Sequence, residues 1–220
     1  MSLYQIQNFI NGKKTSGSGA EMVTLNPATN TVLAKGKEST AVDVDAAVKA
    51  ARAGFEIWKN TPAAERARVL FKAAQILRDR NDELAIVETR DTGRAIQETE
   101  IVDVISGVEC LEYFAGVAGS LAGEHIDLAG NFAYTRREAV GVCAAIGAWN
   151  YPIQIACWKA APALACGNAV VYKPSETTPL SAIAVAEALQ EAGLPDGVYN
   201  VVQGARECGA ALVDHHDVDK

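Results

Sequence analysis

The chain has 220 residues, of which 49% are apolar, enough to bury the core of one large or two small globular domains. Its formal net charge of −7 argues against nucleic acid or an anionic membrane as the main partner, because binding to phosphate groups needs a basic surface. No run of about 18 apolar residues without charge occurs, and the start MSLYQIQNFINGKK lacks the features of a secretory signal. We therefore expect a cytoplasmic protein without a membrane span.

The first part of the chain changes from strand signals to helical ones. Short apolar stretches broken by Asn11-Gly12 and by residues 16–19 indicate strands joined by turns. Apolar residues then follow helical spacing over 44–55, with Thr40 placed as the N-cap and Asp43 as the acid three positions later. The sequence therefore predicts a β-rich start followed by a helix.

Two further helices and a hairpin are expected before residue 140. Thr61 and Pro62 are typical of a cap followed by proline at the first helical position, and the helix they begin runs to about residue 77. A third helical stretch covers 97–118. The pattern over 121–140 indicates a two-stranded hairpin that separates two differently patterned halves.

The C-terminal part alternates strands with helices. We expect strands at 140–146, 169–173 and 198–202, and helices at 152–166, 179–192 and 206–213. Such alternation indicates an α/β fold with a doubly wound parallel sheet and helices on both of its faces. Ligands of these sheets bind beyond the C-terminal ends of the strands, so the candidate binding loops are 147–151, 174–177 and 203–206.

The first of these loops carries a polar and aromatic cluster. Asn150 precedes Pro152, the expected first helical residue, so its carboxamide either stabilises an oxyanion at the helix N-terminus or simply caps the helix. Tyr151 and Trp158 are seven residues apart, which is two turns on one helix face. Their rings either bind a quaternary ammonium group by cation–π attraction or belong to the ordinary core.

The second and third loops suggest a nucleotide. Lys173 and Glu176 follow a buried strand, where a carboxylate can accept from ribose hydroxyls and repel a 2′-phosphate, favouring NAD over NADP. An ion pair on the loop surface is the alternative. The third loop has Gly204 and Gly209 with Arg206 between them, and no GxGxxG fingerprint occurs in the sequence.

Cysteine and histidine give little indication of a metal site. The cysteines show no CxxC spacing and lie among apolar residues, which favours reduced core thiols: Cys110, Cys143, Cys157, Cys166 and Cys208. His215 and His216 stand between Asp214 and Asp217, but adjacent side chains of a helix or strand point in different directions. We expect a solvated segment there.

Several stretches together resemble the aldehyde dehydrogenase superfamily: GAWNYPIQIACWKAAPALACGNAVVYKPSETTPLSA, EAGLPDGVYNVVQG, LNPAT, ETRDTG and YTRRE. The resemblance runs from about residue 4 to the last residue. It implies a Rossmann-like NAD-binding domain made of 1–119 and 139–220, incomplete here, and an oligomerisation hairpin at 120–138 that joins subunits into a homo-oligomer. Family members are more than twice this long, and their catalytic domain has no counterpart in this chain.

The resemblance also assigns roles to single residues. Asn150 corresponds to the oxyanion donor, and Tyr151 and Trp158 match positions that enclose a trimethylammonium head in members acting on betaine aldehyde or 4-trimethylaminobutyraldehyde. The cofactor groove corresponds to Ile146, Gly147, Ala148, Trp149, Lys173, Ser175, Glu176 and Gly204. A site for a monovalent cation, potassium or sodium, corresponds to Thr24, Leu25, Asp91 and Thr177.

The reaction implied by the family is the NAD-dependent oxidation of an aldehyde to an acid, by a cysteine nucleophile and a glutamate-activated water. None of the five cysteines stands in the family's nucleophile context, and Cys157 is expected to be a packed helix residue. Two alternatives follow: the chain is part of a longer enzyme, or it is a non-catalytic fragment that binds part of NAD or associates with full-length subunits. Because Lys173 is basic, NADP stays an alternative cofactor. Arg206 stands where many relatives have glycine, so the resemblance does not assign the contacts to the cofactor phosphates.

Overall fold

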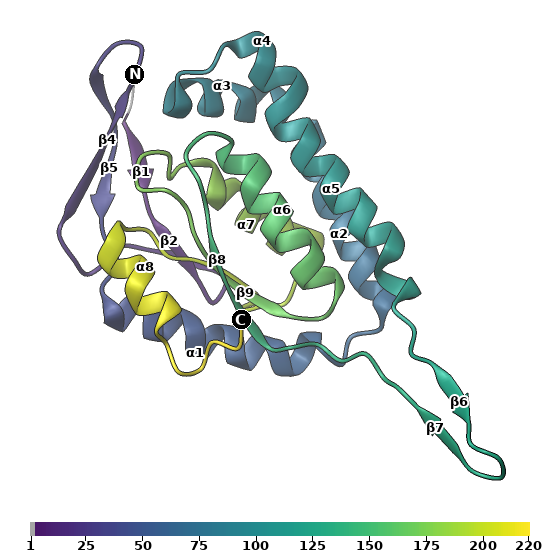
Figure 1. Cartoon of the computed structure of the whole chain (residues 1–220). Coiled ribbons are helices and arrows are strands. Elements are labelled where there is room, and N and C mark those ends of the chain that lie inside the picture. The colour runs from purple at the N-terminus through teal and green to yellow at the C-terminus, as the bar shows by residue number, and fades with distance from the viewer. Residues whose placement is uncertain (1–2) are drawn as a thin grey trace.

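A computed structural model of the chain describes residues 3–220 (Figure 1). The strands are β1 (Tyr4–Ile6), β2 (Asn8–Ile10), β3 (Lys13–Thr15), β4 (Glu21–Asn26), β5 (Thr31–Lys37), β6 (His125–Asp127), β7 (Phe132–Tyr134), β8 (Val142–Ile146), β9 (Ala169–Lys173) and β10 (Tyr199–Val201). The helices are α1 (Ala41–Trp58), α2 (Ala63–Asp79), α3 (Asn81–Thr92), α4 (Ile96–Glu98), α5 (Val104–Val117), α6 (Pro152–Ala165), α7 (Ser181–Ala192) and α8 (Arg206–Val213). A π-helical turn covers Thr99–Asp103, and a 3-10 turn covers Ala118–Ser120.

The central sheet has the order β3-β2-β10-β9-β8, in which β8, β9 and β10 are parallel. Helices α1 and α8 lie on one face of this sheet and α6 and α7 on the other, as Figure 1 shows. This confirms the α/β fold with helices on both faces. The sheet is not wholly parallel, however, because β2 and β3 extend it in antiparallel pairing. The turn at Asn11 and Gly12, both with positive φ, folds β3 back onto β2.

The predicted alternation of strands and helices after residue 140 is confirmed, with element ends differing by one or two residues. Helix α7 begins at Ser181 rather than at residue 179. The N–H of Leu180, just before it, donates to the carboxylate of Asp91 at 3.1 Å. The start of α7 is therefore satisfied by a side chain from α3, a partner that local sequence does not reveal.

The first helix is confirmed together with its cap. Thr40 Oγ1 accepts from the N–H of Val42, and Asp43 accepts from the N–H of Thr40 at 2.8 Å. The cap predicted for the second helix is wrong, because the Thr61 hydroxyl donates back to the carbonyl of Ile57 at 3.2 Å and Pro62 takes the N-cap position.

The helices α2, α3 and α5 add a layer over α6 and α7. The helix expected at 97–118 is interrupted, since the π-helical turn at Thr99–Asp103 separates α4 from α5. Helix α3 was not predicted from the sequence. Its buried face carries the acids Glu88 and Asp91 beside Leu84 and Ala85, so the apolar period is broken.

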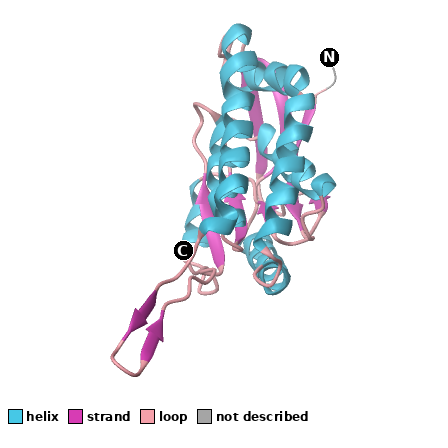
Figure 2. Ribbon diagram, turned by 90° about the vertical axis from the view of Figure 1, so that its right-hand side faces the viewer, coloured by secondary structure: helices cyan, strands magenta, loops and turns pink. Residues whose placement is uncertain are grey.

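Strands β6 and β7 pair antiparallel and form the expected hairpin, which extends away from the rest of the chain in Figures 1 and 2. Ile126, Leu128, Phe132 and Tyr134 are exposed on it. Its role in oligomerisation stays a prediction. In the part of the chain from residue 3 onward, no helix is both long and apolar enough to cross a membrane.

Two buried acids of α3 support the layers around the sheet. Glu88 is fully buried, and one of its carboxylate oxygens accepts from the N–H of Ile153 in the first turn of α6 at 3.4 Å. Burial raises the pKa of Glu88 to about 8. Burial also raises the pKa of Asp91 to about 7. Both carboxyls therefore favour the protonated form in the folded chain well above their ordinary titration range.

We predict that Glu88→Gln makes the chain more stable at pH 8 and flattens its pH dependence. With its pKa raised from 4.5 to about 8, folded Glu88 keeps a proton that the unfolded chain has lost. The free energy of unfolding therefore falls with rising pH across this window, by on the order of 1 kcal/mol per pH unit for one group. Urea unfolding between pH 5 and pH 8.5 measures the slope.

The exposed Glu109→Gln on α5 is the matched control and should leave the slope unchanged. A Glu88→Gln variant with the same slope as the wild type, or one destabilised equally at every pH, would contradict this account of the α3–α6 contact.

Candidate functional site

The three loops predicted to bind a ligand meet at Lys173, the last residue of β9. Its backbone carbonyl accepts from the N–H of Gly147 in the first loop at 2.8 Å. Its ammonium group donates to the carbonyls of Pro174 at 2.8 Å and of Gly204 at 2.7 Å. Lys173 is only 6% exposed. One buried side chain thus holds the carboxyl ends of neighbouring parallel strands together.

Lys173 and Glu176 form the expected charged pair, with 3.6 Å between Nζ and the nearest carboxylate oxygen. An ammonium group has three donors, and two of them are taken by carbonyls. The third is left for Glu176 or for a ligand hydroxyl. Because the Lys173 side chain is buried while the Glu176 side chain is 50% exposed, this is not an ordinary surface ion pair.

The two glycines predicted for the cofactor groove allow close packing. Gly204 has a φ of 153°, and a Cβ there would lie 2.7 Å from Cβ of Cys208 on α8. A Cβ on Gly147 would overlap the Tyr172 hydroxyl. Larger residues would therefore push the first and third loops away from Lys173.

A cleft of about 810 Å³ brings together two groups of predicted residues. Its lining includes the cofactor candidates Trp149, Ser175 and Glu176 and the cation candidates Thr24, Leu25, Asp91 and Thr177. Five other cofactor candidates do not line it: Ile146 and Lys173, which end β8 and β9, and Gly147, Ala148 and Gly204, which lie on loops.

Two of the residues predicted to bind a cation carry buried oxygen atoms that make no hydrogen bond in the described part of the chain. Among residues 3–220, Thr24 Oγ1 and Asp91 Oδ1 are buried and have no hydrogen-bond partner. The pairing of β4 with β5 shifts register between Thr24 and Leu25, and such a bulge leaves backbone groups free of the ladder. Hydroxyl, carboxylate and carbonyl oxygens are the ligands of hard cations. These residues therefore fit a potassium or sodium ion.

Asn150 does not cap α6, so the simpler alternative for it is wrong. The N-cap is Tyr151, which makes no side-chain cap bond, and Asn150 is the exposed residue before it. Throughout the described residues its carboxamide has no hydrogen-bond partner within the chain. A free amide donor beside a helix N-terminus is an arrangement that stabilises developing negative charge.

Tyr151 immediately precedes α6, and Trp158 lies in the middle of that helix. Trp158 is 50% exposed, unlike a core aromatic residue. Tyr151 has a non-helical backbone with φ −143° and ψ 66°. It therefore precedes the helix, and the spacing of two helical turns does not apply to it. Its ring faces the guanidinium of Arg94, whose Cζ lies 4.1 Å from the ring centroid. The sequence analysis missed Arg94, which lies far from Tyr151 along the chain.

Burial makes the thiols of Cys110, Cys157 and Cys208 poor nucleophiles. All five cysteines are free, as expected, and Cys157 is fully buried. Burial raises the pKa of Cys157 strongly and that of Cys110 and Cys208 to about 11. A thiol held protonated at neutral pH does not attack a carbonyl.

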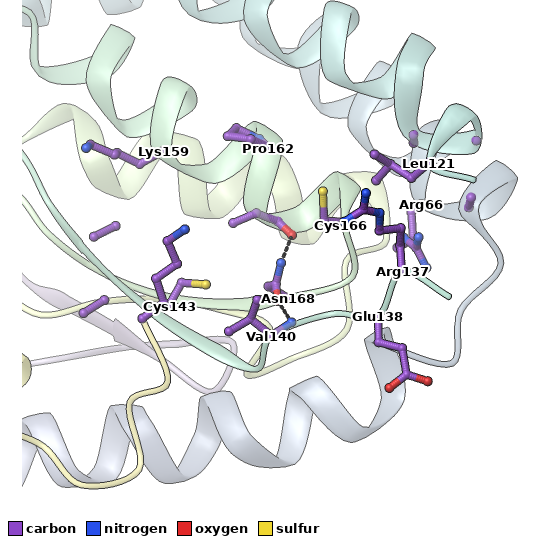
Figure 3. Close-up of a pocket in the computed structure, with 17 residues that line it drawn as sticks. Arg66, Leu121, Arg137, Glu138, Val140, Cys143, Lys159, Pro162, Cys166 and Asn168 are labelled. Atoms are coloured by element: carbon purple, nitrogen blue, oxygen red, sulfur yellow. Dashed lines mark hydrogen bonds between the residues drawn. The ribbon is translucent and has the colours of Figure 1, made fainter. Parts of the chain in front are cut away.

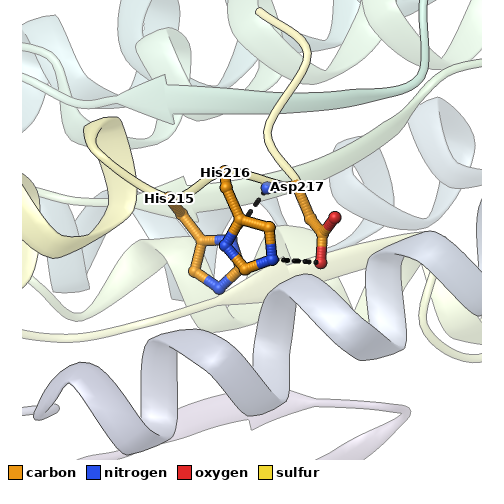
Figure 4. Close-up of side chains that lie close together, drawn as sticks. All are labelled: His215, His216 and Asp217. Carbon is orange, nitrogen blue, oxygen red and sulfur yellow. Dashed lines mark hydrogen bonds and ion pairs between the residues drawn. The ribbon is translucent and has the colours of Figure 1, made fainter.

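His215, His216 and Asp217 lie closer together than expected (Figure 4). The two imidazole rings stack with centroids 4.9 Å apart, because the segment is a turn and not a regular helix or strand. Nδ1 of His215 accepts from the N–H of Asp217 at 3.2 Å, and its Nε2 faces Asp45 at 3.5 Å. The lone pair of His215 Nδ1 accepts this hydrogen bond, so the neutral imidazole carries its proton on Nε2. Neither ring nitrogen of His215 is then free to bind a metal.

A second cavity, of about 640 Å³, lies between β8, α6 and the base of the hairpin (Figure 3). Its polar lining includes Arg66, Arg137, Lys159 and Lys220, and the half-buried thiols of Cys143 and Cys166 face it. None of the predicted site residues lines this cavity. Sequence analysis missed it because its walls come from segments far apart in the chain.

The family model described as "Aldehyde dehydrogenase family" matches residues 14–220. A betaine aldehyde dehydrogenase of Vibrio vulnificus (strain CMCP6) is 54% identical over 215 residues, which cover 97% of this chain and 44% of the relative. The NAD+ complex of an aldehyde dehydrogenase from Bacillus cereus is 42% identical with a TM-score of 0.95, over 98% of this chain and 45% of that one. An indole-3-acetaldehyde dehydrogenase in complex with NAD+ is 37% identical with a TM-score of 0.95, over 100% of this chain and 45% of that one.

The chain thus spans less than half the length of these relatives. Over that span both the sequence and the arrangement of strands and helices agree with theirs, and the family match covers nearly all of the described residues. The chain belongs to the aldehyde dehydrogenase family.

Proposed function

We propose that the full-length protein containing this chain oxidises a trimethylammonium aldehyde, such as betaine aldehyde, to the carboxylic acid with NAD. The observation that carries the proposal is the free Asn150 carboxamide between the cofactor loop and the aromatic residues Tyr151 and Trp158. The 54% identity to a betaine aldehyde dehydrogenase supports the choice of substrate.

NAD is the cofactor that the nucleotide loops fit. The exposed carboxylate of Glu176 can accept from the ribose hydroxyls, and the remaining donor of Lys173 can reach the same hydroxyls. A 2′-phosphate would meet the Glu176 carboxylate, which disfavours NADP. The NAD+ complex of the Bacillus cereus relative supports this assignment. When bound, NAD accepts the hydride that leaves the substrate.

Asn150 would act on the carbonyl end of the substrate. Its Nδ2 donates a hydrogen bond to the aldehyde oxygen as that oxygen becomes an oxyanion, and the N-terminus of α6 adds a favourable dipole. Tyr151 and Trp158 would bind the quaternary ammonium head through their ring faces. Since burial raises the pKa of the Cys110, Cys157 and Cys208 thiols, we assign the nucleophile to the part of the family's length that this chain does not span.

Three further assignments belong to the proposal. A potassium or sodium ion would bind at Thr24, Leu25, Asp91 and Thr177 and would favour the ionised form of Asp91, whose pKa burial otherwise raises. The NAD-binding domain would comprise residues 1–119 and 139–220. The hairpin at 120–138 would join subunits of a homo-oligomer, because its strand edges and apolar side chains are exposed.

We predict that Asn150→Ala in the full-length protein lowers kcat by about 10²- to 10³-fold, the usual effect of removing one oxyanion donor. The KM for the aldehyde should change much less, because the hydrogen bond strengthens only as the oxyanion forms. NADH absorbance measures both constants. Asn60→Ala, at the exposed C-terminal end of α1, is the matched control. A kcat within about 2-fold of the wild type would exclude this role.

We predict that Trp158→Ala raises the KM for betaine aldehyde by about 3- to 30-fold, the range of one cation–π contact. The KM for 3,3-dimethylbutanal, which has carbon in place of the quaternary nitrogen, should rise less. Tyr113→Ala removes another exposed aromatic side chain, on α5, and should change neither value. Unchanged affinity for betaine aldehyde in Trp158→Ala would remove the support for this substrate class.

We predict that Cys157→Ala leaves kcat of the full-length protein within about 2-fold, because a buried protonated thiol takes no part in acyl transfer. The 220-residue chain alone should produce no NADH from any aldehyde. Steady NADH production by that chain, abolished by Cys157→Ala, would instead make Cys157 the nucleophile.

A further inference from the structure

Arg94 lies where α3 ends and the chain turns toward α4. Gly93, with a φ of 78°, is the left-handed C-cap of α3, and Arg94 follows it directly. The guanidinium carbon of Arg94 lies 4.1 Å from the centroid of the Tyr151 ring. At this distance the flat guanidinium group covers one face of the ring.

Two carboxylates hold the guanidinium in this position. Nη2 of Arg94 lies 3.0 Å from a carboxylate oxygen of Glu98, and Nε lies 3.2 Å from one of Asp103. Asp103 is fully buried, at the end of the π-helical turn. Its carboxylate makes no other ion pair in the described part of the chain, so Arg94 is the cation that compensates it.

This arrangement determines what Tyr151 can offer a ligand. The covered face is unavailable, so a cation can approach only the opposite face or the edge of the ring. The three charged groups behind the ring sum to −1, because two carboxylates face one guanidinium. The guanidinium therefore fixes the ring without placing a net positive charge behind it.

We propose that Arg94 is a positioning residue for Tyr151: held by Glu98 and Asp103, it stacks on one face of the phenol ring and presents the other face to the quaternary ammonium head of the substrate. This inference rests on the proposed function, since it assumes that Tyr151 contacts such a head. It adds a specificity-determining contact outside the loop that carries Asn150.

The test uses the full-length protein with Arg94→Met and Arg94→Lys, assayed with betaine aldehyde and with 3,3-dimethylbutanal. We expect Arg94→Met to raise the KM for betaine aldehyde by about 3- to 10-fold with kcat within about 2-fold, because only the cation–π contact loses its geometry. The KM for the neutral analogue should stay within about 2-fold. Arg94→Lys should shift the KM for betaine aldehyde in the same direction by less.

Arg94→Lys also guards against loss of folding, because its ammonium group still compensates Asp103 but cannot lie flat on the ring. Thermal melting of both variants shows that the fold is kept. Arg90→Met is the matched control, since Arg90 stands one turn earlier on α3 and contacts the hydroxyl of Tyr4 at 3.1 Å instead. It should leave both KM values unchanged.

A double variant separates positioning from a general effect. In a Tyr151→Leu background, Arg94→Met should raise the KM for betaine aldehyde no further, because the ring that it positions is gone. Full additivity of the two changes would overturn the inference, and so would an unchanged or lowered KM in both Arg94 variants.

Failure of the proposed function is visible in the wild type alone. If the wild type makes no NADH from betaine aldehyde, or prefers the neutral analogue, the proposed function is wrong and this inference falls with it. If the wild type prefers betaine aldehyde and the Arg94 variants do not differ from it, only the positioning role is wrong.

Discussion

The candidate site depends on one buried ammonium group. Lys173 ends β9, the middle one of the three parallel strands. Its ammonium group bonds carbonyls of the loops after β9 and β10, and its backbone carbonyl accepts from the loop after β8. Burying a lysine ammonium group costs free energy unless its three donors are satisfied. Here two donors bond backbone carbonyls, and the nearest carboxylate oxygen of Glu176 lies 3.6 Å from Nζ. The same interaction that stabilises this edge of the sheet therefore shapes the surface that we assign to the nucleotide.

The substrate side of the site follows from the same loop. From Gly147, bonded to Lys173, the chain continues through Asn150 and Tyr151 into α6, and Trp158 lies on that helix. The start of α6 is supported from α3, where Glu88 accepts the N–H of Ile153. The first-loop residues that we assign to the cofactor and the residues that we assign to the substrate thus lie on one continuous segment, which buried polar contacts support on both sides.

Local patterns in the sequence predicted the parts of the fold that depend on neighbouring residues. The capping box of α1 and the strand and helix alternation after residue 140 are of this kind. Helix α3 was missed because acids occupy two of its buried positions, and the start of α7 was misplaced because Asp91 satisfies it from another helix.

The sequence predicted the loops of the candidate site but not the contacts between distant segments. The loops were located by the rule for strand ends, and the residue roles came from the family resemblance. The contact of Arg94 with Tyr151 and the unpaired oxygens of Thr24 and Asp91 join segments that only the fold brings together. The stacking of His215 on His216 was not predicted, because adjacent side chains point apart in a helix or strand but not in a turn.

The central claim is that the carboxyl edge of the sheet around Lys173 binds the cofactor. A crystal structure of the protein with NAD tests it most directly. The account predicts the adenosine ribose hydroxyls within hydrogen-bond distance of Glu176 and Lys173, with the first loop against the cofactor. Adenosine bound elsewhere, for example in the cavity beside β8, with the carboxylate of Glu176 facing only solvent, would contradict it.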